Sequence, residues 1–246
     1  MASPLDRRVL VVLPAWNEAE SLPTVLTEIR THLPGVSVLV VNDGSSDETS
    51  ALARRHDVEV LDLPFNLGVG GAMRAGFRYA LAEGFDAVVQ VDADGQHDPR
   101  DVPSLVEGLD RSDIVIGARF AERGEYEVRG PRRWAMRVLA DVLSRLARTP
   151  LTDTTSGFRA SGPRAIRLFA VHYPAEYLGD TIESLVLAVR GGLTVEQVGV
   201  AMRARSAGRP SQHPAKAAVY LLRACLALGI SLTRRSQMLV TAEVAA

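Results

Sequence analysis

The sequence lacks the residues that mark disulfide-bonded, zinc-binding and membrane-spanning proteins. Its single cysteine, Cys225, excludes an intramolecular disulfide and a cysteine-based zinc site. No signal-peptide layout precedes the first apolar run. The most apolar segment, 217–232, contains Arg223 and falls short of the roughly 20 residues that a membrane span needs. Apolar residues make up 47% and charged residues 23%, a balance that indicates an ordinary soluble globular domain.

Lysine is almost absent too, since Lys216 is the only lysine among 28 basic residues. The net charge of −1 hides two opposed halves: residues 1–118 hold 9 basic and 19 acidic residues, whereas 119–235 hold 19 and 9. An acidic half beside a basic half suits metal-assisted chemistry on phosphates. We expect no nucleic-acid partner.

Short apolar runs alternate with helical patterns along the chain. The expected strands are 9–13, 36–41, 58–61, 87–91, 113–117 and 193–202. The expected helices are 19–32, 46–56, 69–83, 99–109, 131–148, 163–169, 177–190 and 215–232. This alternation predicts βαβ units and a mostly parallel α/β sheet within a single domain.

Polar residues gather where the first four strands end, and ligands of such sheets bind beyond the carboxyl ends of the strands. The four stretches are Pro14-Ala15-Trp16-Asn17-Glu18, Asn42-Asp43-Gly44-Ser45-Ser46-Asp47, Asn66-Leu67-Gly68-Val69-Gly70-Gly71 and Asp92-Ala93-Asp94-Gly95-Gln96-His97-Asp98. The alternative is that these loops are polar only because turns generally are.

The fourth stretch is the most informative, because Asp92 and Asp94 supply hard oxygen ligands for Mg²⁺ or Mn²⁺. Gln96 or His97 would complete the ligand set and leave positions open for substrate phosphates. The alternative is an aspartate-rich turn that caps the helix at 99–109. We expect this turn to lie on the surface, so that Asp94→Ala would leave the fold intact.

The glycines of the third stretch do not form a dinucleotide fingerprint, because their spacing is wrong and they follow the third strand. Backbone amides there could hold an anion, or the glycines could let the loop pass close to its neighbours. The sequence has no Walker A loop, no nucleophile elbow and no His-Glu-x-x-His motif.

Taken together, the motifs resemble those of family 2 glycosyltransferases, in particular the branch similar to dolichol-phosphate mannose synthase. The matching stretches are collinear: Leu13-Pro14-Ala15-Trp16-Asn17-Glu18, Val41-Asn42-Asp43-Gly44-Ser45-Ser46-Asp47-Glu48-Thr49, Asn66-Leu67-Gly68, Asp92-Ala93-Asp94-Gly95-Gln96-His97, Gly117-Ala118-Arg119-Phe120 and Thr152-Asp153-Thr154-Thr155-Ser156-Gly157-Phe158-Arg159.

The resemblance implies a GT-A fold and inverting transfer from a nucleotide-diphospho-sugar, of the GDP-mannose or UDP-glucose type, to a polyprenyl phosphate. It implies a nucleotide-sugar and metal half at 1–118, a basic acceptor half at 119–212 and a C-terminal helix and tail at 213–246. The residues implied to bind the donor are Pro14, Trp16, Glu18, Asp43, Gly44, Asn66, Gly70 and Asp92. Those implied to hold Mg²⁺ or Mn²⁺ are Asp92, Asp94 and Gln96.

The resemblance also implies a set of residues around the transferred group. These are Asp94, Arg119, Arg133, Asp153, Arg159 and Arg205, of which Asp153 would orient Arg159 or the acceptor phosphate. For the arginines the alternative is a solvated basic face. One extra residue in the loop of Arg205, compared with the family's Arg-x-x-Gly-x-Ser pattern, sets this chain apart.

The nature of the acceptor remains open. A lipid phosphate is already anionic near neutral pH and needs no strong base. A sugar hydroxyl would need a carboxylate base, for which Asp153, Asp180 and Glu183 are the candidates. A non-catalytic nucleotide-sugar binding domain is a further alternative.

We expect a peripheral enzyme at the cytoplasmic face of the membrane, because relatives often carry transmembrane helices that do not follow this domain here. Helices 131–148 and 215–232 are the candidate membrane contacts. Packing of both in the core or in a homodimer interface is the alternative.

Overall fold

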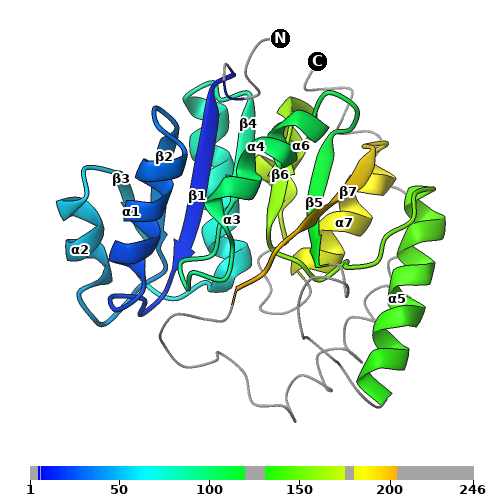
Figure 1. Cartoon of the computed structure of the whole chain (residues 1–246), viewed down its shortest axis with the longest axis horizontal. Helices are drawn as coiled ribbons and strands as arrows, with labels where there is room; N and C mark the ends of the chain where they lie inside the picture. Colours follow the sequence, from blue (N-terminus) through cyan, green and yellow to red (C-terminus); the bar gives the residue numbers. More distant parts are fainter. Residues whose placement is uncertain (1–4, 6, 120–130, 175–179, 204–246) are drawn as a thin grey trace.

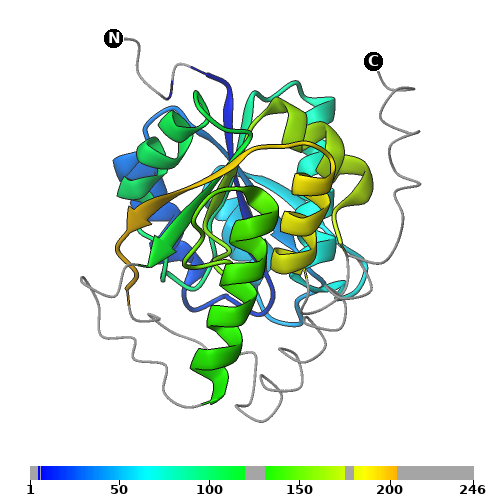
Figure 2. The same ribbon diagram turned by 90° about the vertical axis from the view of Figure 1, so that its right-hand side faces the viewer.

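The computed structural model describes residues 5, 7–119, 131–174 and 180–203, apart from the side chains of 119, 131–138 and 180. These residues form one seven-stranded sheet with helices on both faces (Figures 1 and 2). The predicted α/β class with a mostly parallel sheet is confirmed.

The strands lie close to the expected positions, with one addition. They are β1 (Val9–Ala15), β2 (Ser37–Asn42), β3 (Glu59–Asp62), β4 (Ala87–Gln90), β5 (Ile114–Arg119), β6 (Arg159–Ser161) and β7 (Val195–Val200). The helices are α1 (Leu22–His32), α2 (Thr49–Arg55), α3 (Gly68–Ala82), the 3₁₀ turn η2 (Pro99–Asp101), α4 (Val102–Gly108), α5 (Pro131–Ala147), α6 (Pro163–His172) and α7 (Asp180–Arg190). The predicted helix 215–232 lies outside the described residues.

The strand order is β3-β2-β1-β4-β6-β5-β7, and β6 runs antiparallel to both β4 and β5. The sequence analysis missed β6, because a strand of three residues that includes Arg159 and Ser161 shows no apolar pattern. The chain passes from β1 outward to β2 and β3, then returns to pair β4 on the other side of β1. The sheet therefore has a topological switch point between β1 and β4, where open α/β sheets bind ligands.

Alternate side chains of β1 pack into two core layers, one on each face of the sheet. Val9, Val11 and Leu13 pack in the cluster that includes α1 and α4, whereas Leu10 and Val12 pack in the cluster that includes α3, α6 and α7. Helix α3 lies very close to β1, because a Cβ on Gly76 would lie 2.7 Å from Cγ1 of Val12. The glycine thus permits a close approach between helix and strand.

Helix α5 stands at the β7 edge of the sheet (Figure 1). Its second half packs in the core through Leu139 and Leu143, each only 1% exposed. For this half of the helix, the structure therefore supports the core alternative over membrane contact. Within the described part of the chain, no helix has the length and apolarity to cross a membrane.

Candidate active site

The loops that follow β1 and β2 are joined by hydrogen bonds into one surface beside the switch point. The backbone N–H of Asn17 donates to Oγ of Ser45 at 2.9 Å, and Oδ1 of Asn17 accepts from the N–H of Ser46 at 2.8 Å. The N–H of Glu18 donates to Oγ1 of Thr49 at 2.9 Å. Helix α1 begins after this turn, at Leu22 with Pro23 in its first turn, rather than at the predicted position 19.

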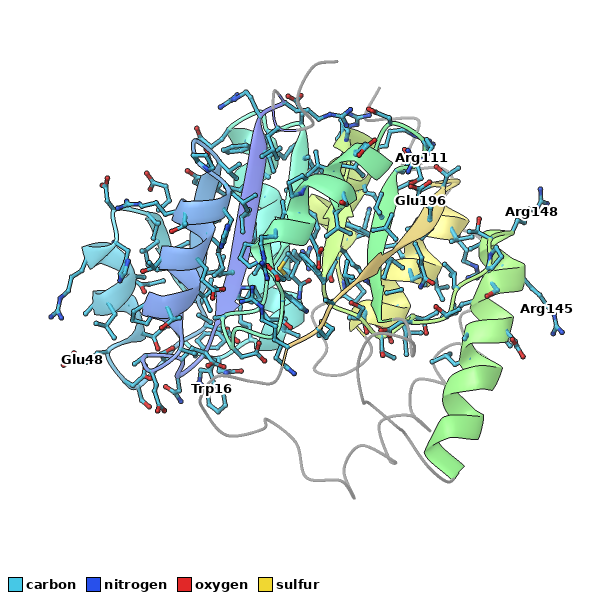
Figure 3. The ribbon with its side chains drawn as sticks, in the orientation of Figure 1. Trp16, Glu48, Arg111, Arg145, Arg148 and Glu196 are labelled. Carbon is cyan, nitrogen blue, oxygen red and sulfur yellow. The ribbon has the colours of Figure 1, made fainter. Side chains whose placement is uncertain are left out.

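Asn17 has a φ of 55°, a conformation that non-glycine residues rarely adopt and that recurs at functional sites. This turn leaves Trp16 45% exposed, and Figure 3 shows its ring at the lower edge of the molecule, beyond the end of β1. The sequence analysis assigned no role to Asn17 or Ser45. The signal was available, because asparagine is one of the few residues that enter the left-handed region readily.

Asp43 is buried, and its carboxylate holds the loop that follows β3. Its Oδ1 accepts from the N–H of Leu67 at 2.7 Å. Burial raises the pKa of Asp43, and the amides of Leu67 and Gly68 oppose that rise. Asp43 therefore fixes the start of α3 in addition to any contact with a donor.

Gly44 lies next to this loop, and side-chain oxygens accept from two backbone amides at the start of α3. Gly44 has a φ of 66°, in the left-handed region that favours glycine. A Cβ at this position would lie 2.6 Å from the carbonyl carbon of Phe65. Oδ1 of Asn66 accepts from the N–H of Gly68 at 3.0 Å, and Gly70 is buried in the first turn. Protein oxygens thus occupy the amides of Leu67 and Gly68, which the sequence analysis offered to an anion.

The turn after β4 carries the candidate metal ligands. Asp92 is partly exposed, whereas Asp94 is only 4% exposed and its Oδ1 accepts from the N–H of Gln96 at 2.9 Å. The expectation that Asp94 lies in a surface turn is therefore wrong, because its side chain is buried. Asp98 alone caps η2, through a bond from the N–H of Arg100.

The donor set fits a divalent cation that shares its coordination with a substrate. Among the described residues, no group of three His, Cys, Asp or Glu side chains could hold a metal. Mg²⁺ typically binds through one or two carboxylates together with substrate phosphates, which matches Asp92 and Asp94 with the amide of Gln96. His97, the alternative third ligand, is 2% exposed, and its Nδ1 accepts from the N–H of Asp92.

Arg159 is buried at 7% exposure in β6. Its guanidinium donates to the carbonyl oxygens of Ser156, Thr154 and Thr181, each at 2.8 Å. Such bonds hold the segment between α5 and β6 in place. Asp153, also buried, accepts from Oγ1 of Thr155 at 3.1 Å.

The other predicted arginines are only partly described. Arg119 is the last residue of β5, at the same edge of the sheet as the β1 and β4 loops, and Arg133 lies in the first turn of α5. Their side chains, and the whole of Arg205, lie outside the described part of the structure. Pro14, near the end of β1, and Glu18, in the loop that follows, lie on either side of Trp16 and are partly buried.

Comparisons with known proteins place this geometry in context. The profile of the family described as "Glycosyl transferase family 2" matches residues 10–172. The chain is 34% identical over 211 residues to an undecaprenyl-phosphate mannosyltransferase of Micrococcus luteus, covering 82% of this chain and 86% of that protein. It is 35% identical over 162 residues to a polyprenol monophosphomannose synthase of Mycolicibacterium smegmatis, covering 63% and 61% of the two chains.

Among solved structures, the chain is similar to glucosyl-3-phosphoglycerate synthase of Mycobacterium tuberculosis in complex with Mn²⁺ and UDP-glucose. The TM-score is 0.70 at 24% identity, with 96% of this chain and 82% of that chain covered. At this identity the likeness supports the fold, and the predicted GT-A architecture is confirmed.

Proposed function

Because the chain belongs to glycosyl transferase family 2, we propose that it transfers a sugar from a nucleotide-diphospho-sugar to a polyprenyl phosphate. The observation that carries the proposal is the pair Asp92 and Asp94 at the switch point, beside the joined loops of β1 and β2. Two relatives named for transfer to polyprenyl phosphates support the choice of acceptor.

On the donor side, Asp92, Asp94 and Gln96 would hold Mg²⁺ or Mn²⁺. A cation there would neutralise the charge that develops on the departing nucleoside diphosphate. Pro14, Trp16 and Glu18 would line the nucleotide, and the exposed ring of Trp16 is suited to stacking on a flat base. Asp43, Gly44, Asn66 and Gly70 would shape the neighbouring wall through the loop that follows β3.

The transfer itself needs little help from a base. An oxygen of the acceptor phosphate forms a bond to the anomeric carbon from the face opposite the diphosphate. The bond between that carbon and the diphosphate oxygen breaks, so the configuration inverts and the nucleoside diphosphate leaves. A phosphate monoester already carries the required negative charge near neutral pH.

Positive charge must bring the two anions together, and we propose Arg119, Arg133 and Arg205 for this role. Arg119 ends β5 at the edge of the sheet where the Asp92 turn lies. Buried Arg159 and Asp153 would act by holding the 152–158 segment that approaches the acceptor.

We also propose that this edge of the sheet meets the cytoplasmic face of the membrane. Three large apolar side chains at the start of α3 are exposed there: Phe65 at 62%, Leu67 at 39% and Val69 at 37%. Burial of such side chains in a lipid interface would bring the site to a lipid-borne phosphate.

The direct test is transfer of radiolabelled sugar from a panel of GDP- and UDP-sugars to a polyprenyl phosphate, with Mn²⁺ or Mg²⁺ present. We expect label to enter the organic phase and nucleoside diphosphate to be released. We expect Asp94→Asn, which preserves the size of this buried side chain, to lower the rate at least 100-fold. The reason is that the cation which neutralises the departing diphosphate would lose a charged ligand.

Three outcomes would contradict the proposal. Label transferred only to water-soluble acceptors would favour the hydroxyl alternative, and binding of donor without release of diphosphate would favour a non-catalytic domain. Full activity in excess EDTA would remove the metal from the reaction. The control is Arg111→Ala, a variant distant from the turn. The side chain of Arg111 is exposed and pairs with Glu196 (Figure 3).

A further inference from the structure

The turn that carries Asp92, Asp94 and Gln96 is closed by the side chain of His97. The N–H of Asp92 donates to Nδ1 of His97 at 3.0 Å. The N–H of Val91 still donates to the carbonyl oxygen of Val12 in β1, whereas the N–H of the next residue, Asp92, finds its acceptor in the imidazole. This bond links the first candidate ligand to the residue directly after the last one.

The imidazole is held firmly in this position. His97 is 2% exposed, and its ring stacks on that of Phe158, with centroids 4.7 Å apart and planes 12° apart. Its backbone forms a bridge to Met202 beyond β7. Phe158 is itself fully buried, so the stacked pair lies inside the protein.

Both ring nitrogens lie near Asp92, and one of them forms a hydrogen bond with it. Since Nδ1 accepts a hydrogen bond, the neutral ring carries its proton on Nε2, which lies 3.6 Å from Oδ2 of Asp92. The other oxygen, Oδ1, accepts from Nε2 of Gln90 at 3.2 Å. Gln90 is itself buried in β4. The main-chain N–H and the Oδ1 of Asp92 are thus held by hydrogen bonds to buried side chains.

We propose that His97 is a positioning residue, which holds Asp92 and the 92–97 turn in the conformation that binds a divalent cation. Carboxylate ligands are commonly held by hydrogen bonds from groups that do not touch the metal, and loss of such groups weakens metal binding. The inference rests on the proposed function only in taking Asp92 as a ligand.

The experiment distinguishes the packing of the His97 ring from the hydrogen bond that its Nδ1 accepts. His97→Phe keeps a flat ring to stack on Phe158 but removes the acceptor, whereas His97→Asn removes the ring but places an amide oxygen near the position of Nδ1. Mn²⁺ binding is measured by the loss of the free Mn²⁺ signal in electron paramagnetic resonance, with UDP in one arm and GDP in the other. Thermal unfolding without metal is measured in parallel.

We expect His97→Phe to weaken Mn²⁺ binding by about 10- to 100-fold. We expect His97→Asn to recover most of this loss, although it packs less well and unfolds at a lower temperature. A purely structural role predicts the reverse order, with the Phe variant close to wild type in metal binding. His32→Phe, at the exposed end of α1, is the matched control and should bind as wild type does.

Equal Mn²⁺ affinity of wild type and His97→Phe would overturn the inference and leave the proposed function standing. A wild type that binds no Mn²⁺ with either nucleotide would instead contradict the proposed metal site itself. Should the Phe variant fail to fold, His97→Gln replaces it, because its longer amide reaches the Nε2 position rather than that of Nδ1. Binding by the Gln variant as tight as by the Asn variant would then overturn the inference.

Discussion

At the residue scale, Asp98 shows how the turn after β4 combines a structural carboxylate with its candidate ligands. Its side chain bonds with Arg100 and also forms an ion pair with Arg203 at 2.8 Å. These bonds, those of Arg100 first, hold the pKa of Asp98 well below its usual value of 3.8. Arg203 also donates from its backbone to the carbonyl of Gln96, so the pair joins the turn to the segment after β7.

The low pKa of Asp98 predicts a specific dependence of stability on pH. A carboxyl group whose pKa is lower in the folded state stabilises the fold above its ordinary pKa, and this contribution is lost as pH falls below that value. We therefore expect Asp98→Asn to reduce the free energy of unfolding by ~2 kcal/mol at pH 7. The difference from wild type should narrow below about pH 4.

Urea unfolding of both proteins between pH 7 and pH 3.5 measures this difference. Arg100→Ala is the companion variant, and because Arg100 is mostly exposed it should reduce the free energy of unfolding less than Asp98→Asn does. A difference that stays constant across the pH range would show that the charge of Asp98 is not its source.

At the element scale, helix α3 packs closely against β1 on the donor side of the proposed site. Helix α3 begins at the loop that Asp43 holds and crosses β1 at Gly76. Val12 is β-branched and fully buried, so it cannot move aside easily. The distance between this helix and the strand therefore depends on the absence of a side chain at position 76.

We expect Gly76→Ala to destabilise the protein by ~1–3 kcal/mol, even though alanine is the better helix former. Val12→Ala should create space, so that the double variant is more stable than the sum of the two single effects predicts. Denaturant unfolding of the four proteins in the double-mutant cycle measures this coupling. Strictly additive effects would mean that the methyl group of alanine does not meet Val12.

At the scale of the whole molecule, one edge of the sheet collects the site and the exposed apolar side chains. Helix α3 provides a matched pair of leucines for the proposed membrane contact. Leu67 precedes its first residue at the site edge and is 39% exposed, whereas Leu81 lies at its other end and is 44% exposed. The two side chains are similarly exposed and lie at opposite ends of α3.

We expect the protein to sediment with phospholipid vesicles, and Leu67→Ser to reduce the bound fraction several-fold through lost apolar burial. Leu81→Ser should bind as wild type does. Equal losses for the two variants, or no sedimentation of wild type, would contradict membrane contact at this edge.

The sequence by itself determined the mostly parallel α/β sheet and the edge of that sheet at which its polar stretches meet. Alternating apolar runs specify strands and helices locally, and parallel strands bring their carboxyl ends to one edge whatever their order. The polar stretches that begin at Pro14, Asn42, Asn66 and Asp92 therefore had to meet there. Their family resemblance is confirmed by the profile that matches residues 10–172.

Only the tertiary structure decided how each side chain is used. Asp94 is buried, and the carboxylate of Asp43 accepts from a backbone amide. Arg159 lies in the unpredicted strand β6, and the ring of His97 lies between Phe158 and Asp92. These outcomes depend on contacts between segments far apart in the chain, such as the antiparallel pairing of β6 with β4 and β5. Local patterns in the sequence carry no record of such contacts.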